Sequence, residues 1–277
     1  MIRPSVVVAS VAASRPGIDA TGASVECRGV EKWFGELNVL AGVDLAIEPG
    51  AFVSVLGPSG CGKTTLMRAI GGLVPIDEGE ILIDGTPVDG PPKNSAIVFQ
   101  SFGLMPWKTI ESNIAFGLQI RGAGRSELKE KVARYIEMVH LTGFEKSYPY
   151  QVSGGMRQRA GLARALAVEP EILLMDEPFA SVDAMTREVL HDELLAIWER
   201  QRQTVVFITH SIDEAVVLSD VIYVMSRSPA TVIAKIEVGI PRPRRERTVR
   251  SLPEFVDLRE RCWSLLEHGG AAEAARA

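Results

Sequence analysis

Short apolar runs that end at a polar residue recur along this chain. Four of them are AFVSVLG (51–57), AIVFQ (96–100), EILLMDE (171–177) and TVVFITH (204–210). Runs that are apolar on both faces are typical of strands buried in a parallel sheet. In open α/β sheets, ligands bind beyond the carboxyl ends of the strands. The pattern therefore predicts that a glycine loop, an amide, two carboxylates and an imidazole meet at one site.

The first of these runs leads into GPSGCGKTT (57–65), which is followed by the helical stretch TLMRAIGGL (65–73). This context and the G-x-x-x-x-G-K-[ST] spacing predict a phosphate-binding P-loop. Its glycines allow the backbone to approach phosphate oxygens, and the helix N-terminus adds positive partial charge. Lys63 is expected to reach the β- and γ-phosphates, and the Thr64 hydroxyl to hold Mg²⁺. The predicted nucleotide contacts are Gly57, Pro58, Ser59, Gly60, Cys61, Gly62, Lys63, Thr64 and Thr65.

Polar side chains at the ends of the other three runs complete the predicted site. Asp176 is placed to hold the magnesium shell, and the adjacent Glu177 to activate the water that attacks the γ-phosphate. His210 is expected to contact the γ-phosphate, although a single histidine is more often structural, and Gln100 to join the magnesium or water shell. The predicted catalytic residues are Glu177, His210 and Gln100, and the predicted metal ligands are Thr64, Gln100 and Asp176.

A second glycine-containing helix start occurs in QVSGGMRQRAGLARAL (151–166). Ser153 occupies the position of an N-cap, and Gly154 and Gly155 leave backbone N–H groups bare. A helix start of this kind attracts an anion. Because the chain already has a phosphate loop, spacing alone does not say what the second site binds.

The motifs occur in the order found in ATP-binding cassette (ABC) ATPases, and residues 24–238 resemble the nucleotide-binding subunit of an ABC transporter. The matching motifs are the P-loop, Gln100, VSGGMRQR, LLMDEP, SVD (181–183) and His210. The resemblance implies an α/β P-loop NTPase fold with a RecA-like core sheet, an antiparallel β lobe and an α-helical signature lobe. It also implies ATP and Mg²⁺ as cofactors.

The resemblance also assigns the second helix start. In this family two cassettes pack head to tail, so the Ser-Gly-Gly segment would face the nucleotide held by the other chain of a homodimer. Asp183 would lie in the loop that communicates across the dimer. Phe34 would stack on adenine, with Trp33 as the alternative and packing in a β-hairpin as a structural interpretation of equal weight. The departures from the family pattern are small: Val152 replaces the usual leucine, and Ser-Val-Asp replaces Ala-Leu-Asp.

The same patterns divide the chain into parts. Residues 1–22 are small, polar and interrupted by Pro and Gly, which predicts a disordered extension rather than a signal peptide. Residues 23–240 are expected to form the ABC ATPase domain, with a helical lobe at about 105–168. Alternation around Asp-Gly in GEILIDGTPV (79–88) predicts a β-hairpin in that domain. Residues 241–277 combine a basic segment with a C-terminal helix.

Composition excludes several other classes of protein. The chain has 277 residues, of which 46% are hydrophobic and 23% charged, as in an ordinary globular protein. The net charge of −5 argues against a protein that wraps nucleic acid. Cys27, Cys61 and Cys262 are far apart and indicate neither a disulfide framework nor a zinc site. No apolar run approaches the roughly 20 residues that cross a bilayer.

Two further segments suggest partners. SFGLMPWKTI (101–110) contains apolar residues that belong either to the core or to a surface for a membrane subunit, and we favour the surface. The basic stretch Arg242–Arg250 is expected to be a solvated face, with contact to anionic lipid as the alternative. The PRPR…LPEFVDLR ending and the LMPW segment are similar to ATPases of the nitrate/sulfonate/taurine importer group.

These features predict the ATP-binding and ATP-hydrolysing subunit of an ABC importer for nitrate, sulfonate, taurine or a related solute. The expected partners are a second copy, transmembrane permease subunits and, indirectly, an extracytoplasmic solute-binding protein, at the cytoplasmic face of the inner membrane. Nucleic acid is not an expected partner. The alternative is a soluble ABC ATPase of DNA repair or translation, which the single cassette and the acidic charge disfavour. The Ser-Gly-Gly helix disfavours a stand-alone P-loop kinase.

Overall fold

The computed structural model of this chain describes residues 21–100, 103–180, 182–244 and 247–268. The extension predicted to be disordered, 1–22, lies outside these residues except at its end. Within the described residues, no helix has both the length and the apolar character that a membrane span requires.

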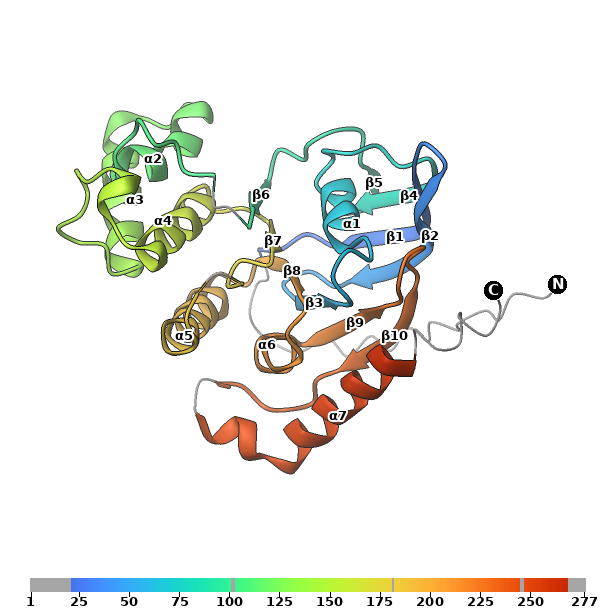
Figure 1. Cartoon of the computed structure of the whole chain (residues 1–277). Coiled ribbons are helices and arrows are strands. Elements are labelled where there is room, and N and C mark those ends of the chain that lie inside the picture. Colours follow the sequence, from blue (N-terminus) through green and yellow to red (C-terminus); the bar gives the residue numbers. More distant parts are fainter. Residues whose placement is uncertain (1–20, 101–102, 181, 245–246, 269–277) are drawn as a thin grey trace.

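A six-stranded sheet in the order β10-β9-β3-β8-β7-β6 forms the centre of the structure (Figure 1). All neighbouring pairs are parallel except β9 and β10, which are antiparallel. β3, β7 and β8 are buried along their whole length, which confirms the parallel sheet expected from runs apolar on both faces. The strands are β3 (Phe52–Leu56), β6 (Ser95–Val98), β7 (Ile172–Asp176), β8 (Thr204–Thr209), β9 (Val221–Met225) and β10 (Val232–Glu237).

A second, antiparallel sheet in the order β2-β1-β4-β5 forms a β lobe beside the core. Its β4–β5 hairpin turns at Asp84 and Gly85, which have φ values of 47° and 72°. Two successive positive φ angles are what a tight type I′ hairpin turn requires. The strands are β1 (Val25–Phe34), β2 (Leu37–Ile47), β4 (Glu78–Ile83) and β5 (Thr86–Pro87).

Three helices, α2 (Ile110–Ile120), α3 (Arg125–Met138) and α4 (Gly154–Ala167), pack on one another in a separate lobe on the β6 side of the sheet (Figure 1). The segment before α2 is fixed by the buried Asn113, whose side-chain amide donates to backbone carbonyls of that segment. The apolar surface predicted for a membrane subunit in this segment is therefore only partly exposed. Leu104 packs against the core, whereas Trp107 is 73% exposed.

Three more helices cover the central sheet: α1 (Lys63–Ile70), α5 (Ala184–Gln201) and α6 (Ile212–Leu218). α1 packs on β2, β7 and β8 and ends before the predicted Leu73, because Gly71 is its C-cap and Gly72 has φ 64°. On the α5 side, the ring of Phe52 lies 5.7 Å from Trp198 and 5.8 Å from Phe207.

The first two arginines of the basic stretch after β10, Arg242 and Arg244, pack against the rest of the protein. The prediction of a solvated face is therefore wrong for them. Arg244 is 2% exposed and donates to the backbone carbonyl of Val238 at 2.9 Å. Arg242 pairs with Asp220 at 3.1 Å and lies 4.3 Å from the ring of Trp198. These contacts hold the chain where it leads to α7 (Pro253–His268), which packs on α6.

Candidate functional site

Two glycines in the left-handed region shape the loop between β3 and α1. Gly60 has φ 76° and Gly62 has φ 122°. A Cβ atom on Gly62 would also lie 3.1 Å from the carbonyl oxygen of Val39 on β2, so a larger residue would be both strained and crowded. Gly62 is the N-cap of α1, and no side chain caps this helix. The N–H groups of its first turn are therefore available to an anion.

Lys63 places a positive charge inside this loop. Its side chain is buried, and Nζ donates to the carbonyl oxygens of Gly57 at 2.9 Å and Pro58 at 2.8 Å. The same Nζ lies 4.0 Å from Glu177 Oε1. The structure thus brings the lysine of the P-loop close to the acidic end of β7.

Thr64 and Asp176 form an oxygen pair at the same edge of the sheet. Thr64 Oγ1 donates to Asp176 Oδ1 at 2.9 Å. Burial raises the pKa of Asp176 above its ordinary value; the Thr64 hydrogen bond opposes this effect, and the Glu177 charge adds to it. Hydroxyl and carboxylate oxygens are donors that Mg²⁺ prefers, so the pair fits the predicted metal.

The protein supplies few further ligands for a metal at this position. Within the described residues, no group of three or more His, Cys, Asp or Glu side chains could hold a metal ion. Mg²⁺ is commonly bound by one or two protein groups together with substrate phosphates and water. The Thr64–Asp176 pair is consistent with that mode of binding.

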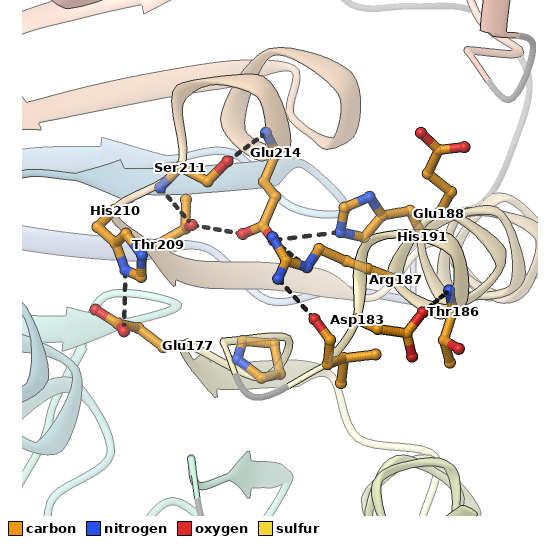
Figure 2. Close-up of polar contacts among 12 residues, drawn as sticks. Glu177, Asp183, Thr186, Arg187, Glu188, His191, Thr209, His210, Ser211 and Glu214 are labelled. Carbon is orange, nitrogen blue, oxygen red and sulfur yellow. Dashed lines mark hydrogen bonds and ion pairs between the residues drawn. The ribbon is translucent and has the colours of Figure 1, made fainter. Parts of the chain in front are cut away.

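Glu177 stands between Lys63 and His210. It has a positive φ of 43°, and its backbone N–H donates to the carbonyl of Ile208 on β8 at 3.0 Å. Positive φ is strained for a residue with a side chain and is often found at functional sites. The carboxylate Oε2 lies 3.1 Å from His210 Nδ1, and the two side chains point toward each other (Figure 2).

Gln100 and Phe34 lie further from these contacts. Gln100 follows the end of β6 and is exposed, and no hydrogen bond joins it to Thr64 or Asp176 in the described residues. Phe34 ends β1 with its ring 51% exposed, and Lys32 Nζ lies 5.4 Å from the ring centroid. Its hairpin partner strand β2 borders the P-loop, because Val39 of β2 lies beside Gly62.

Ser153, Gly154 and Gly155 begin α4 in the helical lobe. The Ser153 hydroxyl accepts the N–H of Met156 at 3.3 Å and so caps its own helix. α4 packs on α2, α3 and β6, whereas α1 packs on the β lobe and the central sheet. The starts of α1 and α4 thus belong to different parts of the described structure.

Asp183 is the N-cap of α5 and accepts the N–H of Thr186 at 3.0 Å; this hydrogen bond is the main reason why the pKa of Asp183 is lowered. The start of α5 also lies close to the start of α4, because a Cβ atom on Gly155 would be 3.3 Å from Thr186 Cγ2. The Gln158 side chain on α4 donates to the carbonyl of Pro178. These contacts join the start of α4 to the loop after β7.

A largely buried polar cluster behind His210 was not predicted from the sequence. Its members are Arg187, His191, Thr209 and Glu214. The available signal was the S-x-x-E spacing of Ser211 and Glu214, which is typical of a helix capping box. That pattern predicts a helix start and not a contact with another helix, because the contact depends on tertiary packing.

Comparison with known proteins identifies the family. Residues 40–180 match the family model described as ABC transporter. The chain is 42% identical over 256 residues to the aliphatic sulfonates import ATP-binding protein SsuB of Bacillus cereus, covering 91% of this chain and 99% of that protein. It is 45% identical over 231 residues to an uncharacterized ABC transporter ATP-binding protein of Methanocaldococcus jannaschii, covering 83% and 85% of the two chains.

Solved structures agree with this assignment. A dimeric post-hydrolysis ATP-binding cassette bound to ADP and Pi superposes with a TM-score of 0.70 at 32% identity, covering 78% of this chain and all of that one. The fold predicted from the motif order is thereby confirmed. The chain belongs to the ABC transporter family and is one of its ATPases.

Proposed function

We propose that this chain powers the import of a sulfonate or a related small anion, and that it does so as a head-to-tail homodimer. The observation that carries the catalytic part is the meeting of Lys63, Glu177 and His210 at the carboxyl edge of one parallel sheet. The relation to the sulfonate import protein, over nearly its full length, supports the direction of transport and the class of solute.

The P-loop is the proposed site for the phosphates of ATP. The segment 57–65 offers backbone N–H groups at an uncapped helix start, and Lys63 supplies a positive charge inside the loop. The lysine is held by loop carbonyls, so it needs little reorganisation to exchange these neutral acceptors for charged phosphate oxygens. Phe34 is the proposed stacking surface for adenine.

Thr64 and Asp176 are the proposed protein ligands of Mg²⁺, with Gln100 completing the shell. When bound, the ion supplies neutralisation of the charge that develops on the phosphates. Asp176 is suited to hold it because its carboxylate lies 2.9 Å from Thr64 Oγ1, and because burial, which raises the pKa of this carboxyl, favours pairing of the anion with a cation.

Glu177 is the proposed base for the attacking water. The carboxylate lies at the edge of the sheet between Lys63 and His210, where it can accept a proton from a water beside the γ-phosphate. His210 orients Glu177 through the 3.1 Å contact and offers its other ring nitrogen to the phosphate. Chemistry in phosphoryl transfer depends mainly on such positioning.

The second half of each site is proposed to come from the partner chain. Ser153, Gly154 and Gly155 form an anion-binding helix start that is separate from the P-loop of the same chain. Asp183 lies in the loop proposed to face the partner. The dimeric state of the structural neighbours supports this arrangement.

Permease subunits are the proposed membrane partners, and an extracytoplasmic binding protein is proposed to select the solute. Trp107, in the segment before α2, is 73% exposed, and we propose it as an apolar contact for a permease subunit. We therefore also propose that the chain is a peripheral subunit at the cytoplasmic face of the inner membrane.

Uptake assays and purification test this function. Cells lacking the gene should lose uptake of an alkanesulfonate, taurine or nitrate, and the wild-type gene but not Glu177→Gln should restore it. Affinity purification from detergent-solubilised membranes should recover permease subunits. Recovery of ribosomes or DNA in their place, with uptake of all three solutes intact, would exclude the importer.

A further inference from the structure

A buried polar cluster joins the loop that carries His210 to the helix that begins after Asp183. The cluster consists of Arg187 and His191 on α5, Thr209 at the end of β8, and Glu214 on α6 (Figure 2). His191, Thr209 and Glu214 are buried, and Arg187 is partly exposed. The proposed ATPase mechanism assigns none of these four side chains a role.

Glu214 takes part in an unusual cap at the start of α6. In a capping box, the glutamate side chain accepts the N–H of the cap residue three positions earlier. Here Thr209 Oγ1 accepts the N–H of Ser211 at 2.9 Å and donates its own hydrogen to Glu214 Oε2 at 2.5 Å. Because the threonine hydroxyl takes the place of the carboxylate, the second oxygen of Glu214 reaches toward α5.

That second oxygen faces two side chains of α5. Glu214 Oε1 lies 3.5 Å from His191 Nε2 and 3.8 Å from Arg187 Nε. Arg187 extends the contacts, because its Nη2 donates at 2.7 Å to the carbonyl of Val182, next to the N-cap of α5. The His191 ring is held edge-on to Phe179 at a centroid distance of 4.9 Å.

The cluster is electrostatically fitted to a charged Glu214. Burial favours a raised pKa for this carboxyl, but the contact with His191, the hydrogen bond from Thr209 and the charge of Arg187 hold the pKa below its ordinary value. A buried carboxylate shared by three elements resists their separation, because displacement of any one leaves the charge less well paired.

We propose that Glu214 is a positioning residue, which fixes His210 and Glu177 relative to the turn at Asp183. The inference rests on the proposed function, in which His210 and Glu177 act on one nucleotide and Asp183 faces the partner chain. Thr209 directly precedes His210, so a shift of its hydroxyl away from Glu214 also displaces the 3.1 Å contact between His210 and Glu177. Through Glu214, the position of the proposed base, Glu177, therefore depends on the position of the turn at Asp183.

The test is steady-state ATP hydrolysis by the purified full-length chain carrying Glu214→Gln, which keeps the size of the side chain but removes its charge. We expect kcat to fall roughly ten- to hundredfold, as for a reacting group displaced by about 1 Å. The KM for ATP and the equilibrium affinity for ATP should stay unchanged. Arg187→Met should also lower kcat, and the double variant should be no slower than the slower single one.

Asp220→Asn is the matched control, because Asp220 forms a similarly buried ion pair with Arg242 beyond the other end of α6. It should lower Tm without lowering kcat. Wild-type turnover in Glu214→Gln, or an equal loss in Asp220→Asn, overturns the inference; if Glu214→Gln does not fold, Arg187→Met decides by the same criteria. Glu177→Gln separates the two proposals: full turnover in that variant contradicts the proposed function itself.

Discussion

The helices α1 and α4 both begin at glycine-containing segments, but they are prepared for an anion in different ways. α1 begins at Gly62 without a side-chain cap, and Lys63 and Glu177 place opposite charges beside it. α4 begins at Ser153, whose hydroxyl already caps the first turn, and that turn contains no acidic residue.

The difference indicates that the two helix starts have different roles. The start of α1 combines a cation, an oxygen pair and a base, so it is equipped for both binding and chemistry. The start of α4 offers only a helix dipole, N–H groups and one hydroxyl, which suit an anion that is already held elsewhere. This contrast supports our proposal that one reaction site needs the α1 region of one chain and the α4 start of another.

The largest expected effect comes from removing the base at the α1 site. Glu177→Gln should lower kcat for ATP hydrolysis by at least about a hundredfold, because general-base catalysis contributes on that order. Binding of ATP should persist, since Lys63 and the loop N–H groups are untouched, and a stable ATP-bound dimer should accumulate. Turnover and sedimentation velocity measure the two results.

Glu171→Gln, at the opposite end of β7, is the control for this variant. It should hydrolyse ATP at the wild-type rate. Wild-type turnover in Glu177→Gln would show that Glu177 is not the base. The proposed chemical difference between the two helix starts would then be wrong.

Removal of the cation should weaken binding rather than chemistry alone. Lys63→Ala deletes a charged donor near the phosphates, and hydrogen bonds to charged groups contribute about 1.5–3 kcal/mol, or roughly ten- to hundredfold in affinity. Titration with a fluorescent ATP analogue measures the loss. Lys131→Ala, which breaks ion pairs with Glu127 and Glu169 on the helical side, should leave the affinity unchanged.

The smallest effect is a gain in stability at the α1 site. Because folding raises the pKa of buried Asp176, the free energy of unfolding falls as pH rises from the ordinary aspartate pKa through the raised one. Asp176→Asn should therefore raise Tm by about 2 °C at pH 7 without Mg²⁺. The gain should shrink as pH falls toward the ordinary aspartate pKa; a gain independent of pH would show another cause.

The sequence predicted that Lys63, Glu177 and His210 lie together, because parallel strands end at one edge of a sheet. Glu177 and His210 lie far apart in the chain, yet the rule that these ends share an edge brings them within 3.1 Å. The contacts of Glu214 and Arg244 could not be predicted in this way. Glu214 matched a local capping pattern, and Arg244 matched a solvated charge run, but helix packing buries both.

The proposal that two chains share each site is tested most directly by mixing two inactive variants, Lys63→Ala and Gly154→Asp. The second should fold, because a Cβ atom on Gly154 meets no atom closer than 3.8 Å, while the new carboxylate repels phosphate. A mixed dimer contains one site with both changes and one site with neither. We predict that ATP hydrolysis returns on mixing. A mixture that exchanges subunits but stays as inactive as each variant alone would contradict the account.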